Sequence, residues 1–203
     1  MHNAPLTVPA GTDRAAVLDL MRARELPQIP EVSADGRVVR LHLLREIVGG
    51  PSVPATAVIM AGGRGTRLRS VTGDLPKPMV PVAGRPILER LVLHLVGSGV
   101  RDVVMAVGYR SEEIEEFFGA GERHGCRIRY LHEDRPRGTA GPLSGLLELD
   151  GSAAVEGGPI LVMNGDLVTS FSVAGLLASH AATGARLTVG VTEYAHEVPY
   201  GVL

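Results

Sequence analysis

The sequence predicts an α/β protein with a mostly parallel sheet and helices on both of its faces, preceded by a small α/β unit. Three observations support this prediction. From residue 57 onward, apolar segments of strand length alternate with segments of helical periodicity, as in repeated βα units. Apolar residues make up 45% of the chain and aromatic residues only 3%, a composition typical of buried parallel strands. A Gly/Pro cluster over residues 49–54 separates the two regions.

Residues 1–48 form the first predicted unit. We expect a helix and a β-hairpin there, over residues 14–24, 28–33 and 37–43. Thr12 or Asp13 can cap the helix, and Gly36 supplies the positive φ of the hairpin turn. A unit of this size buries little apolar surface alone, so it needs a partner surface. Residues 49–56 are predicted as a linker and residues 57–203 as the second domain.

The second domain is predicted to alternate strands and helices. We expect strands at residues 57–61, 102–107, 127–132, 160–163 and 186–191, and helices at 86–96, 111–118, 139–149 and 173–181, with Ser111 as a helix cap. Right-handed crossovers between such units give a parallel sheet, and ligands bind beyond the carboxyl ends of its strands. This rule selects the loops at 62–70, 132–141 and 164–166 as the place of a ligand site.

Charge and composition exclude several classes of function. The formal net charge is -2 and no dense Lys/Arg tract is present, which argues against a nucleic acid or an anionic membrane as the main partner. No segment reaches the roughly 20 apolar residues of a membrane span, and the first residues are not a signal peptide, so we expect a cytoplasmic protein. The single cysteine, Cys126, excludes an internal disulfide and is expected to be structural.

The first selected loop has the chemistry of a phosphate site. It reads Ala61-Gly62-Gly63-Arg64-Gly65-Thr66-Arg67-Leu68 and precedes Pro76-Lys77-Pro78. Glycines after a buried strand expose backbone N–H groups to phosphate oxygens, and Arg67 and Lys77 add positive charge. Lys77 is the only lysine among 20 basic residues, which indicates that its ammonium group is required. The pattern is neither a Walker A motif nor a dinucleotide fingerprint, and the alternative is a plain surface loop.

Residues 58–89 resemble the signature of the sugar-1-phosphate nucleotidyltransferase (sugar-nucleotide pyrophosphorylase) family, in which a Gly-x-Gly-Thr-Arg loop is followed by Pro-Lys-Pro. Residues 133–143 resemble its base-recognition loop, in the style of GDP-mannose pyrophosphorylases. Asn164-Gly165-Asp166 resembles its metal-binding turn, and Pro199-Tyr200-Gly201-Val202 the start of its sugar-binding region. The family's Pro-Leu-Thr is replaced at residues 69–72. The resemblance covers residues 57–203 and implies a Rossmann-like sheet of the nucleotide-diphospho-sugar transferase type.

The resemblance implies transfer of a nucleotidyl group from a nucleoside triphosphate to a sugar 1-phosphate, with release of pyrophosphate. Arg67 would neutralise the pyrophosphate, Lys77 the phosphates at the reacting centre, and Asp166 would hold Mg²⁺. The implied nucleotide contacts are Ala61, Gly62, Gly63, Gly65, Thr66, Glu133, Gly138 and Thr139, and the implied sugar contacts are Asn164, Tyr200 and Gly201.

The residue types fit these roles. A carboxylate at a strand end, such as Asp166, can hold Mg²⁺ on phosphate groups, although a solvated loop residue is the alternative. Nucleotidyl transfer needs no covalent protein nucleophile. His94 and His132 have no evident orienting partner in the sequence and are expected to be structural.

The residue type of Glu133 indicates which base the site binds. A carboxylate only accepts hydrogen bonds, so it suits guanine, whose N1–H and N2–H₂ present two adjacent donors. Uracil and thymine place a carbonyl on each side of a single N–H, and a carboxylate repels those carbonyls. GTP is therefore favoured over UTP, dTTP and CTP, unless Glu133 points to solvent.

Residues 5–48 resemble one cystathionine-β-synthase-type (CBS) repeat, a module that normally binds adenine nucleotides in pairs. The likeness rests on residues 17–21, 26–30, 35–39 and 41–45. Only one repeat is present and its family-typical Asp is Glu46, so we do not expect it to bind a ligand. If a homo-oligomer forms, this repeat is the expected contact. We expect the chain to be part of a longer enzyme that is cut short at residue 203. The alternative function is an inactive or regulatory nucleotide-binding fragment.

Overall fold

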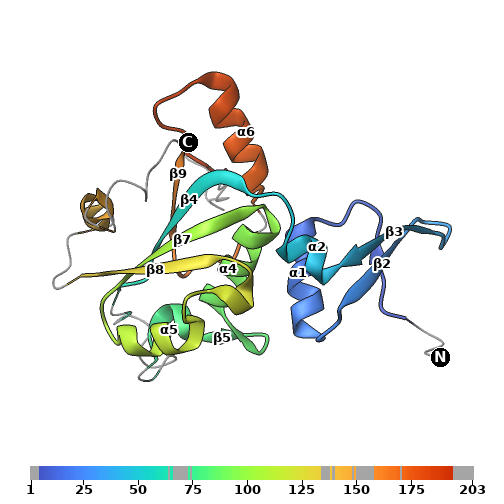
Figure 1. Ribbon diagram of the computed structural model, residues 1–203, viewed down its shortest axis with the longest axis horizontal. Helices are drawn as coiled ribbons and strands as arrows, with labels where there is room; N and C mark the ends of the chain where they lie inside the picture. The colour runs from blue at the N-terminus through green and yellow to red at the C-terminus, as the bar shows by residue number, and fades with distance from the viewer. Residues whose placement is uncertain are drawn as a thin grey trace, which may run out of the picture. The chain divides into compact units, whose positions relative to one another are not determined.

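The computed structural model describes residues 5–63, 65, 73, 75–133, 138, 140–147, 149, 158–169 and 171–193 (Figure 1). The chain divides into two compact units, Met1–Phe171 and Ser172–Leu203. The first unit holds a three-stranded sheet, a four-stranded sheet and a two-stranded hairpin among its described residues. The α/β class predicted from the sequence is confirmed. No helix in the described part of the chain is long and apolar enough to cross a membrane.

The N-terminal sheet consists of β1 (Val8–Pro9), β2 (Gln28–Val32) and β3 (Val38–Leu43), flanked by α1 (Arg14–Ala23) and α2 (Leu44–Val48). Asp13 caps α1 by accepting a hydrogen bond from the Ala15 backbone N–H at 3.0 Å. The predicted helix and hairpin are therefore confirmed, with Asp13 rather than Thr12 as the cap. The sequence analysis missed β1 and α2, because each is too short to show a periodic pattern.

A buried pair of titratable side chains lies between β2 and β3. The Glu31 carboxylate accepts a hydrogen bond from the Gly11 N–H at 2.7 Å and lies 2.8 Å from His42 Nε2. The hydrogen bond from Gly11 lowers the pKa of Glu31; burial opposes this shift, and His42 and Arg40 add to it. The Glu31 carboxyl group therefore stays ionised inside the sheet at pH values somewhat below its ordinary pKa of 4.5.

Replacing Glu31 with glutamine should flatten the acid dependence of stability. A carboxyl with a lowered pKa in the folded state stabilises the fold above its unfolded pKa, and this stabilisation is lost as pH falls through the folded pKa. We expect Glu31→Gln to be less stable than wild type at neutral pH, with the difference shrinking below pH 4.5. Thermal unfolding across this range checks it, with the exposed Asp35→Asn as control. A stability difference that is constant across the range would contradict the assignment.

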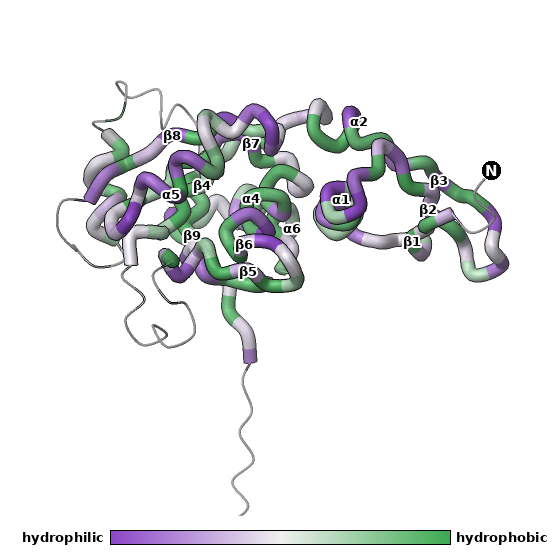
Figure 2. The backbone as a smooth tube through the Cα atoms, turned by 90° about the horizontal axis from the view of Figure 1, so that it is seen from below, coloured by the Kyte–Doolittle hydropathy of each residue, from purple (hydrophilic) through white to green (hydrophobic). Residues whose placement is uncertain are grey.

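The four-stranded sheet has the strand order β8–β7–β4–β9, and every neighbouring pair is parallel. Its strands are β4 (Val53–Met60), β7 (Val100–Val107), β8 (Arg127–His132) and β9 (Ile160–Asn164). The two central strands, β4 and β7, are apolar along most of their length (Figure 2) because both of their faces are buried. β4 already pairs with β7 at Val53, so residues 53–56 of the predicted linker are strand.

Helical segments cover both faces of this sheet. They are η2 (Lys77–Met79), α4 (Ile87–Gly97), α5 (Ser111–Phe118), η3 (Glu122–His124) and η4 (Gly141–Leu147), with the hairpin β5 (Pro81–Val82) and β6 (Arg85–Pro86) before α4. Right-handed crossovers from β4 to β7 to β8 place α4 and α5 on one face, and the return to β9 places η4 on the other. There Leu146 packs against Val58 and Val104.

Two predicted helices in this domain differ from the structure in detail. Residues 139–149 were predicted as an α-helix, but the described residues form the 3₁₀ helix η4. Its two glycines, Gly141 and Gly145, disfavour an α-helix. Ser111 was predicted as a cap, but it is the first residue of α5, and Arg110 occupies the cap position with a φ of 52°.

The second unit contains α6 (Val173–Thr183), which Ser172 caps through its hydroxyl. The strand predicted at residues 186–191 is wrong, since the described residues after α6 form neither helix nor strand. Leu187, Val189 and Val191 alternate with smaller residues but are largely exposed. Alternation predicts a strand only where a neighbouring strand accepts its backbone hydrogen bonds, and none does so within the described part of this unit.

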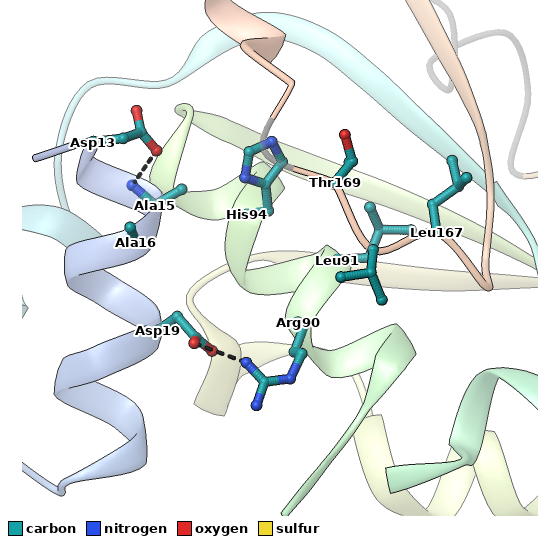
Figure 3. A pocket seen from close by; sticks show the side chains of 10 residues that line it. Asp13, Ala15, Ala16, Asp19, Arg90, Leu91, His94, Leu167 and Thr169 are labelled. Carbon is teal, nitrogen blue, oxygen red and sulfur yellow. Dashed lines mark hydrogen bonds and ion pairs between the residues drawn. The ribbon is translucent and has the colours of Figure 1, made fainter. Parts of the chain in front are cut away.

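The N-terminal sheet and its helices pack on the larger domain through α1 and α4. The two helices are so close that a Cβ added at Gly97 of α4 would lie 2.4 Å from the Cα of Ala15 on α1. α4 thus supplies the partner surface that so small a module requires. Beside this contact, α1, α4 and residues 167–169 line a cavity of about 230 Å³ (Figure 3).

Candidate nucleotide-binding site

The order of the strands locates the site. β9 pairs with β4 on the side opposite β7, although the chain reaches it from β8 at the far edge of the sheet (Figure 1). The direction of winding therefore reverses between β4 and β9. In open parallel sheets, ligands bind beyond the carboxyl ends of the strands at such a reversal. Met60 of β4 is in register with Asn164 of β9 there.

The glycine loop leaves β4 at this point. Ala61 is buried and its N–H bonds to the Ala106 carbonyl at 2.8 Å, which continues the sheet by one residue. A Cβ added at Gly62 would lie 2.7 Å from Glu133 Oε2 and 3.4 Å from the Gly108 nitrogen, so a larger residue here would displace the Glu133 carboxylate. Among the described residues, no atom lies within 4 Å of a Cβ added at Gly63.

Glu133 directly follows β8, and its N–H bonds to the Val107 carbonyl at 2.9 Å. This bond extends the β7–β8 pairing by one residue and directs the half-buried carboxylate against Gly62. The structure thus joins two residues that the sequence analysis assigned to the nucleotide. His132, the residue before it, instead lies near Glu115 of α5, with 3.8 Å between Nε2 and Oε1.

Lys77 and Asp166 form the second part of the site. The Lys77 ammonium group donates a hydrogen bond to Asp166 Oδ2, and 89 positions separate these residues in the sequence. The two side chains are partly exposed, at 36% and 30%, so the pair can exchange partners with a ligand. Asp166 is held by the turn after β9, where the Gly165 N–H bonds to the Met60 carbonyl at 2.8 Å.

The glycine loop also contacts Lys77. A Cβ added at Gly65 would lie 2.9 Å from the Cβ of Lys77, and Gly65 has a φ of 58°, in the left-handed region. Glycine is therefore required here both by space and by conformation. Gly65, Lys77 and Asp166 thus form one cluster, although they come from three separate segments of the chain.

One further residue of the site was missed by the sequence analysis. Gly108 follows β7, and a Cβ added there would lie 3.1 Å from the Gly62 carbonyl oxygen. The rule that ligands bind beyond strand ends could have selected it, because it occupies the same position after β7 that Glu133 occupies after β8.

The donor set suits a metal that keeps water and substrate ligands. The described residues contain no group of three or more His, Cys, Asp or Glu side chains placed to hold a metal. Mg²⁺ in nucleotide enzymes commonly uses one or two carboxylates, with water and phosphate oxygens completing its shell. The partly exposed carboxylate of Asp166 fits this kind of ligand set. Asn164, two residues before Asp166, is exposed at the end of β9.

Several predicted site residues are not part of this cluster. Gly138 is exposed, and its carbonyl accepts a hydrogen bond from the Gly141 N–H at 3.2 Å. Predictions also fall outside the described residues, namely those for Thr66, Arg67, Thr139, Tyr200 and Gly201.

His94 and Cys126 were predicted to be structural residues. His94 Nε2 lies 2.8 Å from the Phe171 carbonyl oxygen. Cys126 is buried, and burial raises its pKa to about 12. A thiol with such a pKa stays protonated at neutral pH and is a poor nucleophile. The site therefore offers backbone N–H groups, one ammonium and two carboxylates, which suits the binding of phosphates and a metal.

Known proteins are similar to this chain in sequence and in architecture. The family described as nucleotidyl transferase matches residues 56–203. The mannose-1-phosphate guanylyltransferase catalytic subunit beta of Danio rerio is 40% identical over 148 residues, covering 72% of this chain and 40% of that protein. The mannose-1-phosphate guanyltransferase of Gibberella zeae is 37% identical over 147 residues, with the same coverage of 72% and 40%.

A solved structure is also similar to this chain. HddC from Yersinia pseudotuberculosis, in its crystal structure with GMP-PN, is similar with a TM-score of 0.51 and 31% identity. The similarity covers 62% of this chain and 53% of that chain. The chain spans about 40% of the length of the two guanylyltransferases that it matches.

Proposed function

Because the chain belongs to the nucleotidyl transferase family, we propose that it forms the nucleotide-binding side of an enzyme that transfers a nucleotidyl group from GTP to a sugar 1-phosphate. The observation that supports this most directly is the contact between Lys77 and Asp166 beside Gly65, at the carboxyl ends of β4 and β9. This contact brings a cation and a carboxylate together at the carboxyl ends of the strands, where α/β sheets commonly bind nucleotides.

In the proposed reaction, an oxygen of the sugar phosphate attacks the α-phosphorus of the nucleotide. A new P–O bond forms, the bond to the β-phosphate oxygen breaks, and pyrophosphate leaves with its electron pair. The chain contributes by orienting the triphosphate on the backbone of Gly62 and Gly63 and by neutralising charge with Lys77. Bound at Asp166, Mg²⁺ would neutralise further phosphate charge. Arg67 is proposed to neutralise the departing pyrophosphate, as the family resemblance implies.

The ion pair between Lys77 and Asp166 gives these residues a resting state. When a nucleotide binds, a phosphate oxygen can replace the carboxylate as the partner of the Lys77 ammonium group. The released Asp166 carboxylate is then available to Mg²⁺. Nucleotide and metal binding are therefore expected to reinforce each other, since each removes a competitor of the other.

The proposed base is guanine and the first sugar to test is mannose 1-phosphate. Relatives at 37% and 40% identity are named for both, and the carboxylate of Glu133 suits the two donors of guanine. The position of Glu133 supports the proposal, because its carboxylate lies against Gly62, at the start of the glycine loop that is proposed to bind the phosphates. Asn164, Tyr200, Gly201, Gly138 and Thr139 remain proposals for sugar and nucleotide contacts.

Residues 5–48 are proposed to be a single CBS-type repeat. Support comes from the way they fold, as a separate three-stranded sheet with α1 and α2. The buried Glu31 and His42 pair shows that this small sheet has a specific polar core.

The reaction is tested by measuring pyrophosphate release from each of GTP, UTP, dTTP, CTP and ATP, combined with a panel of sugar 1-phosphates and Mg²⁺. The protein is expressed from its complete reading frame. We expect release with GTP, and most with mannose 1-phosphate. A folded protein that releases no pyrophosphate from any combination would overturn the proposed function.

Base choice is tested separately by Glu133→Gln. Glutamine keeps the size of the side chain but loses the charge and one acceptor, so GTP should bind more weakly by on the order of 1 to 3 kcal/mol. Binding of the five nucleotides is measured by calorimetry on both proteins. Glu115→Gln is the matched control, because its carboxylate lies near His132 rather than Gly62. Equal affinity of the wild type for all five nucleotides would remove Glu133 from base recognition.

A further inference from the structure

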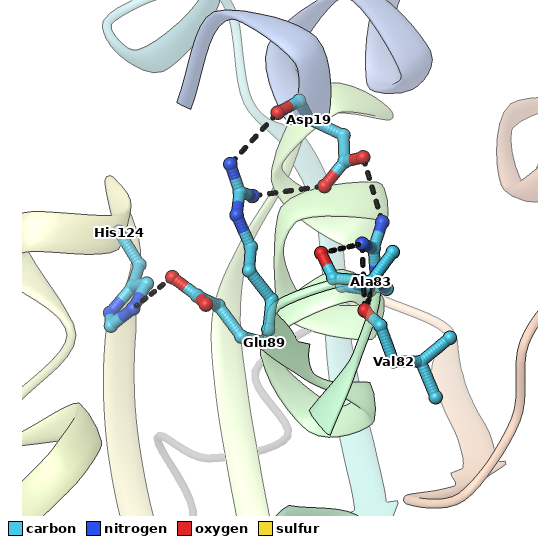
Figure 4. A network of polar contacts seen from close by, with 7 residues as sticks. Asp19, Val82, Ala83, Glu89 and His124 are labelled. Atoms are coloured by element: carbon cyan, nitrogen blue, oxygen red, sulfur yellow. Dashed lines mark hydrogen bonds and ion pairs between the residues drawn. The ribbon is translucent and has the colours of Figure 1, made fainter. Parts of the chain in front are cut away.

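Asp19 links the N-terminal module to two arginines of the larger domain (Figure 4). Its carboxylate accepts hydrogen bonds from Arg85 Nη1 at 3.0 Å and from Arg90 Nη1 at 2.9 Å. Arg85 also donates to the Asp19 backbone carbonyl at 3.0 Å. The two arginine side chains are only 12% and 24% exposed, so they depend on this carboxylate more than surface arginines would.

Both arginines belong to the segment that follows Lys77. Arg85 is in β6, and Arg90 of α4 donates from Nε and Nη2 to the Val82 carbonyl at 3.0 and 2.9 Å. Arg90 Nη2 also reaches the Ala83 carbonyl at 3.3 Å, and Ala83 has a φ of 49°. A non-glycine residue keeps such a conformation only where its surroundings hold it. Arg90, oriented by Asp19, therefore fixes the turn of the β5–β6 hairpin.

The hairpin is directly connected to Lys77. The Val80 N–H bonds to the Lys77 carbonyl at 3.3 Å, and the Ile87 N–H bonds to the Val80 carbonyl at 3.2 Å. These bonds join the 3₁₀ turn that contains Lys77 to both ends of the hairpin. A displacement of the hairpin therefore moves the backbone from which the Lys77 ammonium group reaches Asp166.

α4, the helix that contains Arg90, also borders the segment that follows Asp166. Residues 167–169 follow Asp166 and line the cavity of about 230 Å³ together with α1 and α4 (Figure 3). Apolar packing is incomplete on that side, because the cavity separates α1 from residues 167–169. The polar contacts of Asp19 are thus the more specific link between α1 and the segment that follows Lys77.

We propose that Asp19 is a positioning residue for the contact between Lys77 and Asp166, through which the N-terminal module controls the geometry of the candidate active site. The effect on catalysis rests on the proposed function, whereas the effect on Lys77 does not. Removing the charge of Asp19 releases Arg85 and Arg90, loosens the hairpin turn and lowers the fraction of molecules in which Lys77 contacts Asp166.

The test uses the fact that Lys77 is the only lysine in this sequence. The folded protein is treated briefly with an amine-acylating reagent, and modification of the Lys77 peptide is quantified by mass spectrometry. Without the contact to Asp166, the Lys77 amine is more accessible to the reagent. We expect Asp19→Asn to raise the labelling rate of Lys77 several-fold and Asp19→Glu, which keeps a carboxylate, to restore most of the protection.

Asp102→Asn is the matched control. Like Asp19, Asp102 pairs with two arginines, with 2.9 Å to Arg127 and 3.5 Å to Arg129, and its side chain is 31% exposed against 33% for Asp19. It lies near the amino-terminal end of β7, at the opposite edge of the sheet from Lys77. We expect Asp102→Asn to lower thermal stability to a similar extent without changing the labelling of Lys77.

A kinetic measurement completes the test in the protein expressed from its complete reading frame. We expect Asp19→Asn to lower kcat by a larger factor than it raises the KM for GTP, because a misplaced Lys77 loses transition-state contacts as well as a contact to the bound triphosphate. Unchanged labelling of Lys77 in Asp19→Asn, or equal acceleration in both aspartate variants, would overturn the inference. A wild-type protein without turnover would overturn the proposed function instead, and the labelling result would still decide the role of Asp19.

Discussion

Replacing Lys77 with arginine should lower kcat for pyrophosphate release by about 10²-fold or more, with little loss of stability. The ammonium group of Lys77 contacts Asp166 from a restricted position, since the Cα of Gly65 lies close to the base of its side chain. A guanidinium group is larger and planar, so it cannot occupy the same point and direct its charge at the same oxygen. Steady-state kinetics with GTP, and thermal unfolding as a check of folding, measure the two effects.

Lys77→Met is the companion to this change, because methionine keeps an unbranched side chain and removes the charge. It should reduce kcat at least as much as arginine does. If misplacement of the charge is the cause, Lys77→Arg retains nucleotide binding better than Lys77→Met. An arginine variant with undiminished kcat would remove Lys77 from the reacting centre.

The strands of the central sheet were predictable because their signal is local. β8 has the predicted bounds, 127–132, and the strand at 160–163 is longer by one residue in the structure. β4 and β7 are buried on both faces and therefore appear in the sequence as continuous apolar runs. The segment at 186–191 has a similar composition, yet it forms no strand, because pairing depends on a neighbour that the local sequence does not specify.

The sequence predicted which loops form the site, but not the contacts between them. The rule of strand ends selected the loops that contain Gly62, Glu133 and Asp166, and the structure places all three at the carboxyl edge of the sheet. The contact between Lys77 and Asp166 could not be inferred, since it depends on β9 lying beside β4. The role of Asp19 was even harder to predict, because Asp19 belongs to a separate module that shows no catalytic motif. The roles assigned to these residues stay predictions.

Asp166→Asn should raise the Mg²⁺ concentration needed for half-maximal activity and lower kcat at saturating Mg²⁺ by about 10²-fold. Asparagine is nearly the same size as aspartate but carries no charge, so it is a much weaker ligand for a hard divalent cation. The described residues contain no group of three or more His, Cys, Asp or Glu side chains that could hold the metal in its place. Activity measured across a series of Mg²⁺ concentrations, at fixed GTP, gives both values.

The same variant separates the two roles that the geometry allows for Asp166. As the partner of Lys77, Asp166 protects the ammonium group in the absence of ligands, and Asp166→Asn should therefore speed acylation of Lys77 with or without Mg²⁺. As a metal ligand, it should in addition shift the Mg²⁺ dependence of activity, which the ion pair alone does not explain. Faster labelling with an unchanged Mg²⁺ midpoint would leave Asp166 as a positioning partner of Lys77 and assign the metal to another group.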